Sequence, residues 1–376
     1  MSEPRTPSIY AIAREAGVSH ATVARILNGR GIYRRPTDAQ RAEHIRRLAA
    51  QMGYRPNAAA RATASGRFGS VALLLSTMGD RSNLPQPLLN GIHDALAAQG
   101  MHLTVTRLPD EKLTDAGYVP KILREVSADG LLIDYTHGVP AAMIELIKQH
   151  RLPAIWLNTK RDTDAVYADD LGLGRLATEH LLALGHRRIG YLGRKPAPDD
   201  NQVMHYSQLD RLRGHELAMR DAGLEPEVRR PALHRARQSR RDLLHAWLRE
   251  PEPPTALLTY RGTDAQTALF VAQELGLAVP GDLSVMALGS PTTDWVADRW
   301  WVTSASPDER ALGERAVALL EQKIAQPHRE QPAVAIPGHV HQEKGNTCAP
   351  TRGRGVDGSE EARPASPAPL GDGSSK

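Results

Sequence analysis

Apolar residues near the N-terminus recur every three or four positions, which is the spacing of amphipathic helices. They predict a first helix over residues 9–16, a second over 19–28 whose N-cap is Ser19, and a third over 37–52. The third begins with Thr37 and Gln40 at capping-box spacing. Two short helices joined by a glycine turn describe a helix-turn-helix, whose second helix lies in the major groove of DNA.

Residues 70–345 alternate between short apolar runs and amphipathic stretches. The predicted strands are the apolar runs at 71–75, 103–106, 130–133, 154–157, 188–192, 255–258 and 284–287. Continuous apolar strands that alternate with helices indicate parallel sheets covered on both faces, and this length suffices for two such sheets. Residues 346–376 are rich in Gly, Pro and Ser and are expected to form a disordered tail.

Composition restricts the class of protein. The 376 residues are 41% hydrophobic and 24% charged, and they contain no apolar run long enough to span a membrane. The length favours two or three domains. The N-terminus has no secretory signal, and the single cysteine, Cys348, permits no intrachain disulfide. We therefore expect a cytoplasmic protein.

Charge is unevenly distributed along the chain. The formal net charge is only +4, but residues 1–70 hold twelve arginines and four acidic residues, so that they carry +8 and the remainder carries −4. A basic N-terminal module on a mildly acidic body is typical of a protein whose one end binds a polyanion. The alternative is a solvated basic face without a partner.

Four segments have distinctive sequences: IAREAGVSHATVARILNG at 12–29, GYRPNA at 53–58, DDLGLGRLATEHLLALGHRRI at 169–189 and GLAVPGDLSV at 276–285. In this order they resemble the helix-turn-helix, the hinge entry, the effector-domain signature and the late helix-to-strand turn of the lactose and galactose repressor (LacI/GalR) family. The resemblance extends over about residues 8–348.

The resemblance implies an all-α helix-turn-helix headpiece at residues 1–54, a hinge helix or linker at 55–69, and an α/β effector-binding and dimerisation domain at 70–345. The last resembles periplasmic sugar-binding proteins, with two lobes built on two parallel, doubly wound sheets. The resemblance further implies a transcriptional regulator, expected to be a repressor, that binds a palindromic operator as a homodimer. A small carbohydrate-related effector held between the lobes modulates it.

The resemblance also assigns residues that contact DNA. His20, Ala21 and Arg25 align with the specificity positions, and a guanidinium can donate two hydrogen bonds to guanine. Arg25 is therefore the main candidate for base reading, although it could instead clamp a phosphate or remain solvated. His20 suits a base edge or a phosphate, and Ala21 suits a thymine methyl. The other candidates for DNA contact are Ser19, Thr22, Asn28, Arg34, Arg35, Tyr54, Asn57, Ala60, Arg61 and Thr63.

Two of these DNA segments depart from the family. Thr63 stands where the family usually carries a leucine that wedges between base pairs of the minor groove, so the bend should be weaker unless Arg61 compensates by entering that groove. The loop at 30–36, which contains Arg34 and Arg35, is a few residues longer than usual. Its arginines suit phosphate contact, and the alternative is a flexible surface insertion.

The effector site also departs from the family. Arg211, in the sequence RLRG, falls on the effector arginine, and Asp169 and Trp295 are further candidates. The usual Asn-Asp is replaced by Arg261–Gly262, and a later acidic pair by Gly289–Ser290. The loss of groups that bind sugar hydroxyls, together with the gain of Arg261, favours a sugar acid or a phosphosugar over a neutral sugar.

Alternatives to this effector site remain. Arg261 could face solvent or pair with Asp264, in which case the protein would be a regulator without a small-molecule effector. Trp295 could pack in the core rather than line the site. A cytoplasmic ligand-binding module is a further alternative, although the basic headpiece argues against it. The sequence contains no phosphate loop, nucleophile elbow or metal-spaced cluster, so an enzyme, a metal site and a cofactor are not expected.

Overall fold

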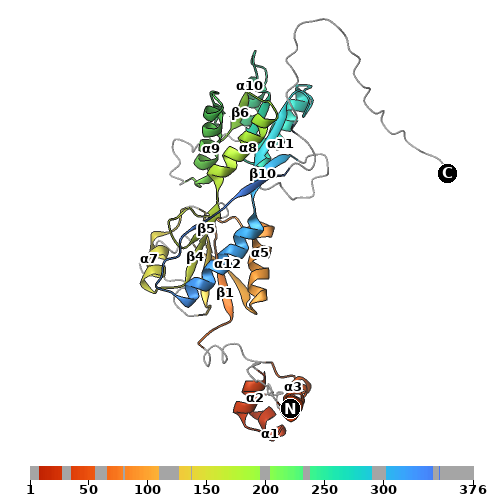
Figure 1. Cartoon of the computed structure of the whole chain (residues 1–376), viewed down its shortest axis with the longest axis vertical. Coiled ribbons are helices and arrows are strands. Elements are labelled where there is room, and N and C mark those ends of the chain that lie inside the picture. The colour runs from red at the N-terminus through yellow and green to blue at the C-terminus, as the bar shows by residue number, and fades with distance from the viewer. Residues whose placement is uncertain are drawn as a thin grey trace, which may run out of the picture. The chain divides into compact units, whose positions relative to one another are not determined.

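The computed structural model describes residues 8–27, 35–55, 66–78, 81–109, 127–136, 138–194, 204–231, 238–289, 302–341 and 347 (Figure 1). The chain divides into two compact units. The first comprises Met1–Tyr135, Val139–Leu157 and Gly313–Gln331, and the second comprises Thr136–Gly138, Asn158–Leu312 and Pro332–Lys376. Most of the expected hinge and all of the expected C-terminal tail except Thr347 lie outside the described residues.

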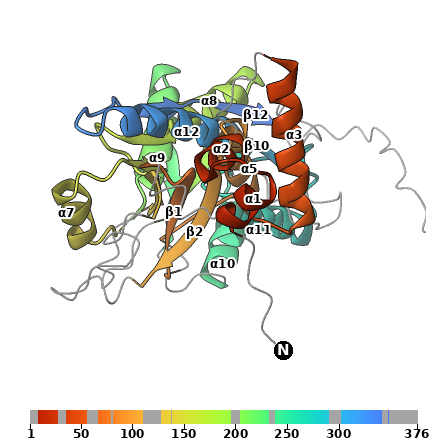
Figure 2. The ribbon, with the colours of Figure 1, turned by 90° about the horizontal axis from the view of Figure 1, so that it is seen from below.

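The N-terminal segment forms the three predicted helices, α1 (Ile9–Glu15), α2 (His20–Leu27) and α3 (Pro36–Gln51). Their apolar faces meet in one small core, and Figure 2 shows the long α3 beside the two shorter helices. The core consists of Ile12, Ala13, Val23, Ile26, Ala42, Ile45 and Ala49. Helical spacing of apolar residues therefore predicted both the helices and their buried faces.

The predicted capping box of α3 is wrong. The helix begins one residue earlier, at Pro36, and its N-cap is Arg35, whose side chain makes no capping hydrogen bond. Thr37 therefore lies inside the first turn and not at the cap. Proline fits the first helical position because its φ is already helical and its missing N–H has no partner there in any case.

The first sheet has the strand order β11-β5-β4-β3-β1-β2. Its strands are β1 (Ser70–Ser76), β2 (His102–Leu108), β3 (Gly130–Asp134), β4 (Ala154–Leu157), β5 (Ala165–Ala168) and β11 (Val334–Ile336). The accompanying helices are α5 (Gln86–Ala98), α7 (Ala141–Gln149) and α12 (Glu309–Ala325). The pairings of β1 with β2 and β3, of β3 with β4 and of β5 with β11 are all parallel.

The second sheet has the strand order β12-β10-β9-β8-β6-β7. Its strands are β6 (Ile189–Leu192), β7 (Glu227–Arg229), β8 (Ala256–Thr259), β9 (Ser284–Leu288), β10 (Thr303–Pro307) and β12 (Gly338–His341). The helices of this unit are α8 (Asp170–Ala183), α9 (Ser207–Asp221), α10 (Gln238–Trp247) and α11 (Gly262–Glu274). Only the β10–β12 pairing is antiparallel among those described for this sheet.

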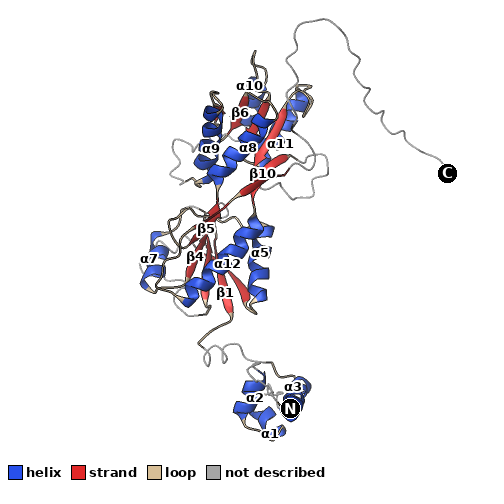
Figure 3. Ribbon diagram, viewed as in Figure 1, coloured by secondary structure: helices blue, strands red, loops and turns tan. Residues whose placement is uncertain are grey.

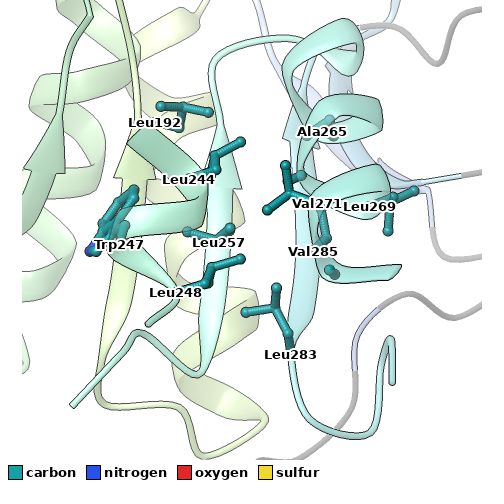
Figure 4. Packing of buried hydrophobic residues seen from close by; sticks show 13 residues of the cluster. Leu192, Leu244, Trp247, Leu248, Leu257, Ala265, Leu269, Val271, Leu283 and Val285 are labelled. Carbon is teal, nitrogen blue, oxygen red and sulfur yellow. The ribbon is translucent and has the colours of Figure 1, made fainter. Parts of the chain in front are cut away.

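Alternate residues of β8 and β9, in the middle of the second sheet, supply two separate cores. Leu257 and Val285 pack with residues of α10 and α11 (Figure 4). Leu258 and Met286 pack with residues of α8 and α9 on the opposite face. Because successive side chains of a strand point to opposite faces, a sheet covered on both sides needs apolar residues at every position. Figure 3 shows helices on both sides of the strands of this unit.

All seven strands predicted from apolar runs are present. Strands β5, β7, β10, β11 and β12 were not among these runs; β7 and β11 have three residues each, and β10 contains buried serines. Parallel sheets covered by helices confirm the predicted fold class. Among the described residues, none of the helices combines the length and the apolar character that a membrane crossing requires.

Candidate functional site

The exposed face of α2 carries the residues that sequence analysis assigned to base reading. His20, Ala21 and Arg25 are exposed, whereas Val23 and Ile26 of the same helix are buried in the headpiece core. The helix is therefore anchored by one face and presents the other to solvent. This is the arrangement that a recognition helix needs, because side chains must reach base edges without disturbing the core.

Neighbouring side chains fix the start of α2. The Ser19 hydroxyl accepts a hydrogen bond from the Thr22 backbone N–H at 3.2 Å and lies 2.9 Å from the Thr22 hydroxyl. The His20 ring contacts the ring of Tyr10, with 5.1 Å between centroids. These contacts orient the exposed end of the helix.

The other residues assigned to DNA divide into two groups. Arg35 is exposed at the start of α3, and Tyr54 is half-buried against the headpiece core. Those that lie outside the described residues are Asn28, Arg34, Asn57, Ala60, Arg61 and Thr63.

In the second unit, two glycines allow α8 and α9 to approach closely. A Cβ atom on Gly174 would overlap the backbone carbonyl of Arg211, and one on Gly214 would overlap the carbonyl of Leu171. This close packing brings the first turn of α8 against the second turn of α9, and it places Arg211 of α9 beside Asp170 of α8.

We predict that Gly214→Ala lowers the free energy of unfolding by about 1–3 kcal/mol, because the added methyl group overlaps backbone that cannot rotate away. Gly281→Ala is the matched control, since its Cβ would make only an ordinary contact with Ala278 at 3.4 Å. Urea denaturation of both variants measures the difference. Equal stability of the two variants would contradict the prediction.

Arg211 is held from several sides. Its Nε donates to Asp170 Oδ1 at 2.6 Å and its Nη1 donates to the Tyr260 carbonyl at 3.0 Å. Gly289, at the end of β9 with φ of 95°, leaves room for the guanidinium, since a Cβ there would lie 3.3 Å from Nη1. Burial alone would lower the pKa of Arg211, but Asp170, Tyr260 and Tyr191 together outweigh it and the pKa is raised above its ordinary value. Arg211 is therefore a fixed positive charge.

The structure brings the second predicted arginine, Arg261, to the same place. The guanidinium carbons of Arg211 and Arg261 lie 5.2 and 5.7 Å from the ring centroid of Tyr260, within cation–π distance. Arg261 is the N-cap of α11 and is half-exposed. The described ion pairs of Asp264 are with Arg194 and Arg240, not with Arg261 as the sequence left open.

The other two effector candidates have different placements. Asp169 is the N-cap of α8, and its carboxylate accepts the Gly172 backbone N–H at 2.9 Å. Trp295 lies outside the described residues. Of the adjacent acids, Asp170 is thus the one that faces Arg211.

Several residues of this site were not predicted from the sequence as part of an effector site. Tyr260 connects the two arginines, and its hydroxyl lies 2.9 Å from the Ser207 hydroxyl. Arg194, Arg240 and Asp264 form a buried charged group beside Arg261. The signal for this group was a charged residue, Asp264, at a position of α11 that faces the core. The sequence did not show which arginines would reach it.

Comparison with known families finds two matches. Residues 8–57 match the bacterial regulatory proteins of the lacI family, and residues 178–343 match the periplasmic binding protein-like domain. The first match covers α1, α2 and α3, and the second covers most of the second unit.

Characterised relatives extend the similarity over most of the chain. The HTH-type transcriptional regulator GntR of Pseudomonas aeruginosa is 27% identical over 324 residues, which cover 85% of this chain and 90% of the relative. The HTH-type transcriptional repressor PurR of Pectobacterium carotovorum is 24% identical over 341 residues, which cover 88% and 94%. These relatives are transcriptional regulators and not enzymes, as the sequence led us to expect.

Solved structures share the fold. The Lac repressor dimer bound to operator and the anti-inducer ONPF matches with a TM-score of 0.70 and 21% identity, covering 92% of this chain and 100% of that one. The transcriptional regulator CelR in complex with cellobiose matches with a TM-score of 0.57 and 23% identity, covering 89% and 98%. A helix-turn-helix followed by a periplasmic-binding-protein-like domain is therefore the architecture of this chain.

Proposed function

The chain belongs to the lacI family of bacterial regulatory proteins, and from this premise we propose that it is a repressor that binds a palindromic operator as a homodimer. The observation that carries the proposal is the anchored α2 with His20, Ala21 and Arg25 on its exposed face. A single helix-turn-helix reads only half a site, so a two-fold symmetric dimer would read a palindrome. The protein would act in the cytoplasm, where its DNA is located.

Selection of bound DNA from a random pool tests this function. The full chain is expected to recover a near-palindromic sequence, and binding should weaken steeply as salt is raised because phosphate contacts release counterions. Recovery of an asymmetric half-site by a monomeric protein would contradict binding as a homodimer. Recovery of no sequence at all would contradict the proposal that the protein is a DNA-binding regulator.

Arg25→Ala is expected to cost about 1–3 kcal/mol of binding and to relax one base position of the selected site, because a guanidinium pairs with guanine in a fixed geometry. Arg35→Ala, the matched control, should weaken all sequences alike and reduce the salt slope by about one unit. A mismatch series in gel-shift assays measures both variants. Identical behaviour across the series would mean that Arg25 contacts a phosphate.

The headpiece, hinge and effector domain at 1–54, 55–69 and 70–345 are proposed as the functional division of the chain. In the hinge, Thr63 and Arg61 would contact the minor groove, and the shorter Thr63 side chain would bend the operator less than a leucine does.

For the effector, we propose an anionic, carbohydrate-related molecule that binds at Arg211 and Arg261. The support is the shared contact of both guanidiniums with Tyr260, and the absence of side-chain bulk at Gly289. Such a ligand can change operator affinity only by binding the DNA-competent and incompetent states unequally. If Arg261→Ala leaves the effect of every ligand on operator affinity unchanged, the effector site is elsewhere or absent.

A further inference from the structure

Three arginines and one carboxylate meet where β6 and β8 of the second sheet end. Arg194 follows β6, Arg261 follows β8, Arg240 belongs to α10, and Asp264 lies in the first turn of α11. In Figure 4, Leu192 and Ala265 lie at one end of the apolar core and Leu283 at the other. Leu192 is the last residue of β6, so the charged group caps the end of this core where the parallel strands end.

The positive charges of this group exceed the negative ones. Arg240 Nη1 lies 2.8 Å from Asp264 Oδ1, which is a close ion pair, whereas Arg194 Nε lies 3.6 Å from Oδ2 of the same carboxylate. One carboxylate therefore serves two guanidiniums, and the described contact of Arg261 is with an uncharged ring. Within the described residues the group carries three positive charges against one negative charge.

Two of the three guanidiniums and the carboxylate are buried, whereas the third guanidinium, that of Arg261, is half-exposed. The side chains of Arg194, Arg240 and Asp264 are 12%, 8% and 0% exposed, and the Nε atoms of both arginines are buried without a hydrogen-bond partner. Burial lowers the pKa of Arg194, and repulsion from Arg261 and Arg240 lowers it further against the attraction of Asp264. Buried charge is stable only when it is paired, and among the described residues the group has no second anion to pair with its excess positive charge.

Two further features suit an anion. The side chain of Arg261 does not cap α11, so the N–H groups of Gly262 and Thr263 at its first turn receive no side-chain partner from the N-cap, and the helix dipole favours negative charge there. Tyr191, 1% exposed, has a buried hydroxyl without a hydrogen-bond partner, and its charged surroundings include Arg211 and Arg230. Arg230 Nε in turn donates to the Arg194 carbonyl at 2.8 Å.

We propose that this arginine group binds a phosphate dianion of the effector, with Arg194 and Arg261 as the direct ligands and Arg240 as the residue that balances Asp264. The proposal rests on the effector response proposed above and names the class of effector, a phosphorylated sugar and not a sugar acid. A monoanionic carboxylate would offset only one of the two excess charges, whereas a phosphate monoester at neutral pH offsets nearly both. Guanidinium forks also match the geometry of phosphate oxygens.

The test uses the full chain and inorganic phosphate as the probe, with sulfate and acetate at matched ionic strength. Phosphate and sulfate should raise the unfolding temperature and acetate should not. In isothermal titration, Arg261→Gln and Arg194→Gln should each weaken phosphate binding roughly tenfold or more, the loss expected for one charge-assisted hydrogen-bonding group. Arg241→Gln is the control, because Arg241 belongs to the same unit but pairs with Glu274 at the surface.

Asp264→Asn separates a binding role from a structural one. Removal of the carboxylate leaves the cationic excess larger, so phosphate should bind several-fold more tightly even though the folded chain is less stable. A structural role alone would not produce this opposite sign. Should Asp264→Asn fail to fold, the half-exposed Arg261 still provides a decisive variant.

The outcomes distinguish the phosphate site from the regulator. Equal phosphate affinity of the wild type and Arg261→Gln would overturn the proposed site, and this is the result expected if phosphate binds only at the basic headpiece. Equal affinity of the wild type for phosphate and acetate would overturn it as well. If DNA selection recovers an operator but phosphate does not bind, the site is wrong and the regulator stands. If phosphate binds through Arg261 but no DNA sequence is recovered, the site stands and the regulator is wrong.

Discussion

Replacing Arg211 with methionine is expected to lower the free energy of unfolding by about 3–5 kcal/mol. Asp170, 1% exposed, would lose the guanidinium that lies 2.6 Å from its carboxylate, and the Tyr260 carbonyl would lose a donor. A buried carboxylate without a partner carries the full cost of its lost hydration. Methionine has nearly the same length as the arginine stem, so little of the effect should arise from a cavity. Urea denaturation of the second unit measures it.

A double variant identifies the cause. Asp170→Asn combined with Arg211→Met removes both charges, and it should recover much of the stability lost in the single variant, because replacement of both partners of a buried pair is often close to neutral. Arg241→Met, which breaks an exposed pair with Glu274, is the control and should change stability little. If the double variant is no more stable than Arg211→Met, the loss comes from packing and not from the unpaired charge.

The same pair explains how Arg211 could serve an effector. Asp170 holds the guanidinium in one orientation, and Gly289 leaves space against Nη1. A donor fixed in advance binds a ligand at a lower entropy cost than a mobile side chain does. Arg211 is already paired with Asp170, so it should mainly orient a bound effector. Arg261 is not paired with Asp264, so it should mainly supply positive charge to that effector.

The fold was predictable because its signals are local. Runs such as 131–133 and 285–287 are apolar at every position, since both faces of each sheet are covered. Strand β10 was missed because Ser304 and Ser306 are buried polar residues, which interrupt the apolar pattern although they pack inside. The α3 cap was misread because Pro36 sets the helix start more strongly than the Thr37 side chain does.

The site was predictable only in part, because it depends on long-range packing. Arg211 and Arg261 could be named from the sequence, but Tyr260 as their common contact could not. The adjacent acids Asp169 and Asp170 look equivalent in the sequence, yet the first caps α8 and the second faces Arg211. The residue at which α8 begins decides which acid is the N-cap and which faces Arg211. That position in turn depends on how α8 packs against α9.

Asp134→Asn is expected to stabilise the first unit at neutral pH, and this is the second large effect. The Asp134 carboxylate lies at the end of β3 and is 0% exposed, and its oxygens have no side-chain hydrogen-bond partner among the described residues. Burial raises its pKa to about 8, and a backbone hydrogen bond from Asn83 lowers the pKa only in part. At pH 7 the folded chain therefore keeps this group protonated, whereas the unfolded chain ionises it.

The sign of the pH dependence follows from this difference. Below about pH 4 both states are protonated and the group has no effect on stability. As pH rises toward 8 the unfolded state alone loses its proton, so the wild type loses about 1.4 kcal/mol per pH unit, and above pH 8 the loss is constant. Asparagine has no such proton, so the stability gain of the variant should be absent near pH 4 and reach at most about 4 kcal/mol at pH 7.

Asp129→Asn is the matched control, because the same substitution should have the opposite sign there. Asp129 accepts hydrogen bonds from the backbone N–H groups of Phe68 and Gly69 at 2.7 and 2.9 Å, and a neutral amide accepts them less strongly than a carboxylate. Hydrogen exchange of the β3 amides, measured across this pH range, reports the stability of the first unit in both variants. A gain in Asp134→Asn that does not vary with pH would show that the carboxylate is ionised and paired in the folded protein, and the burial argument would then be wrong.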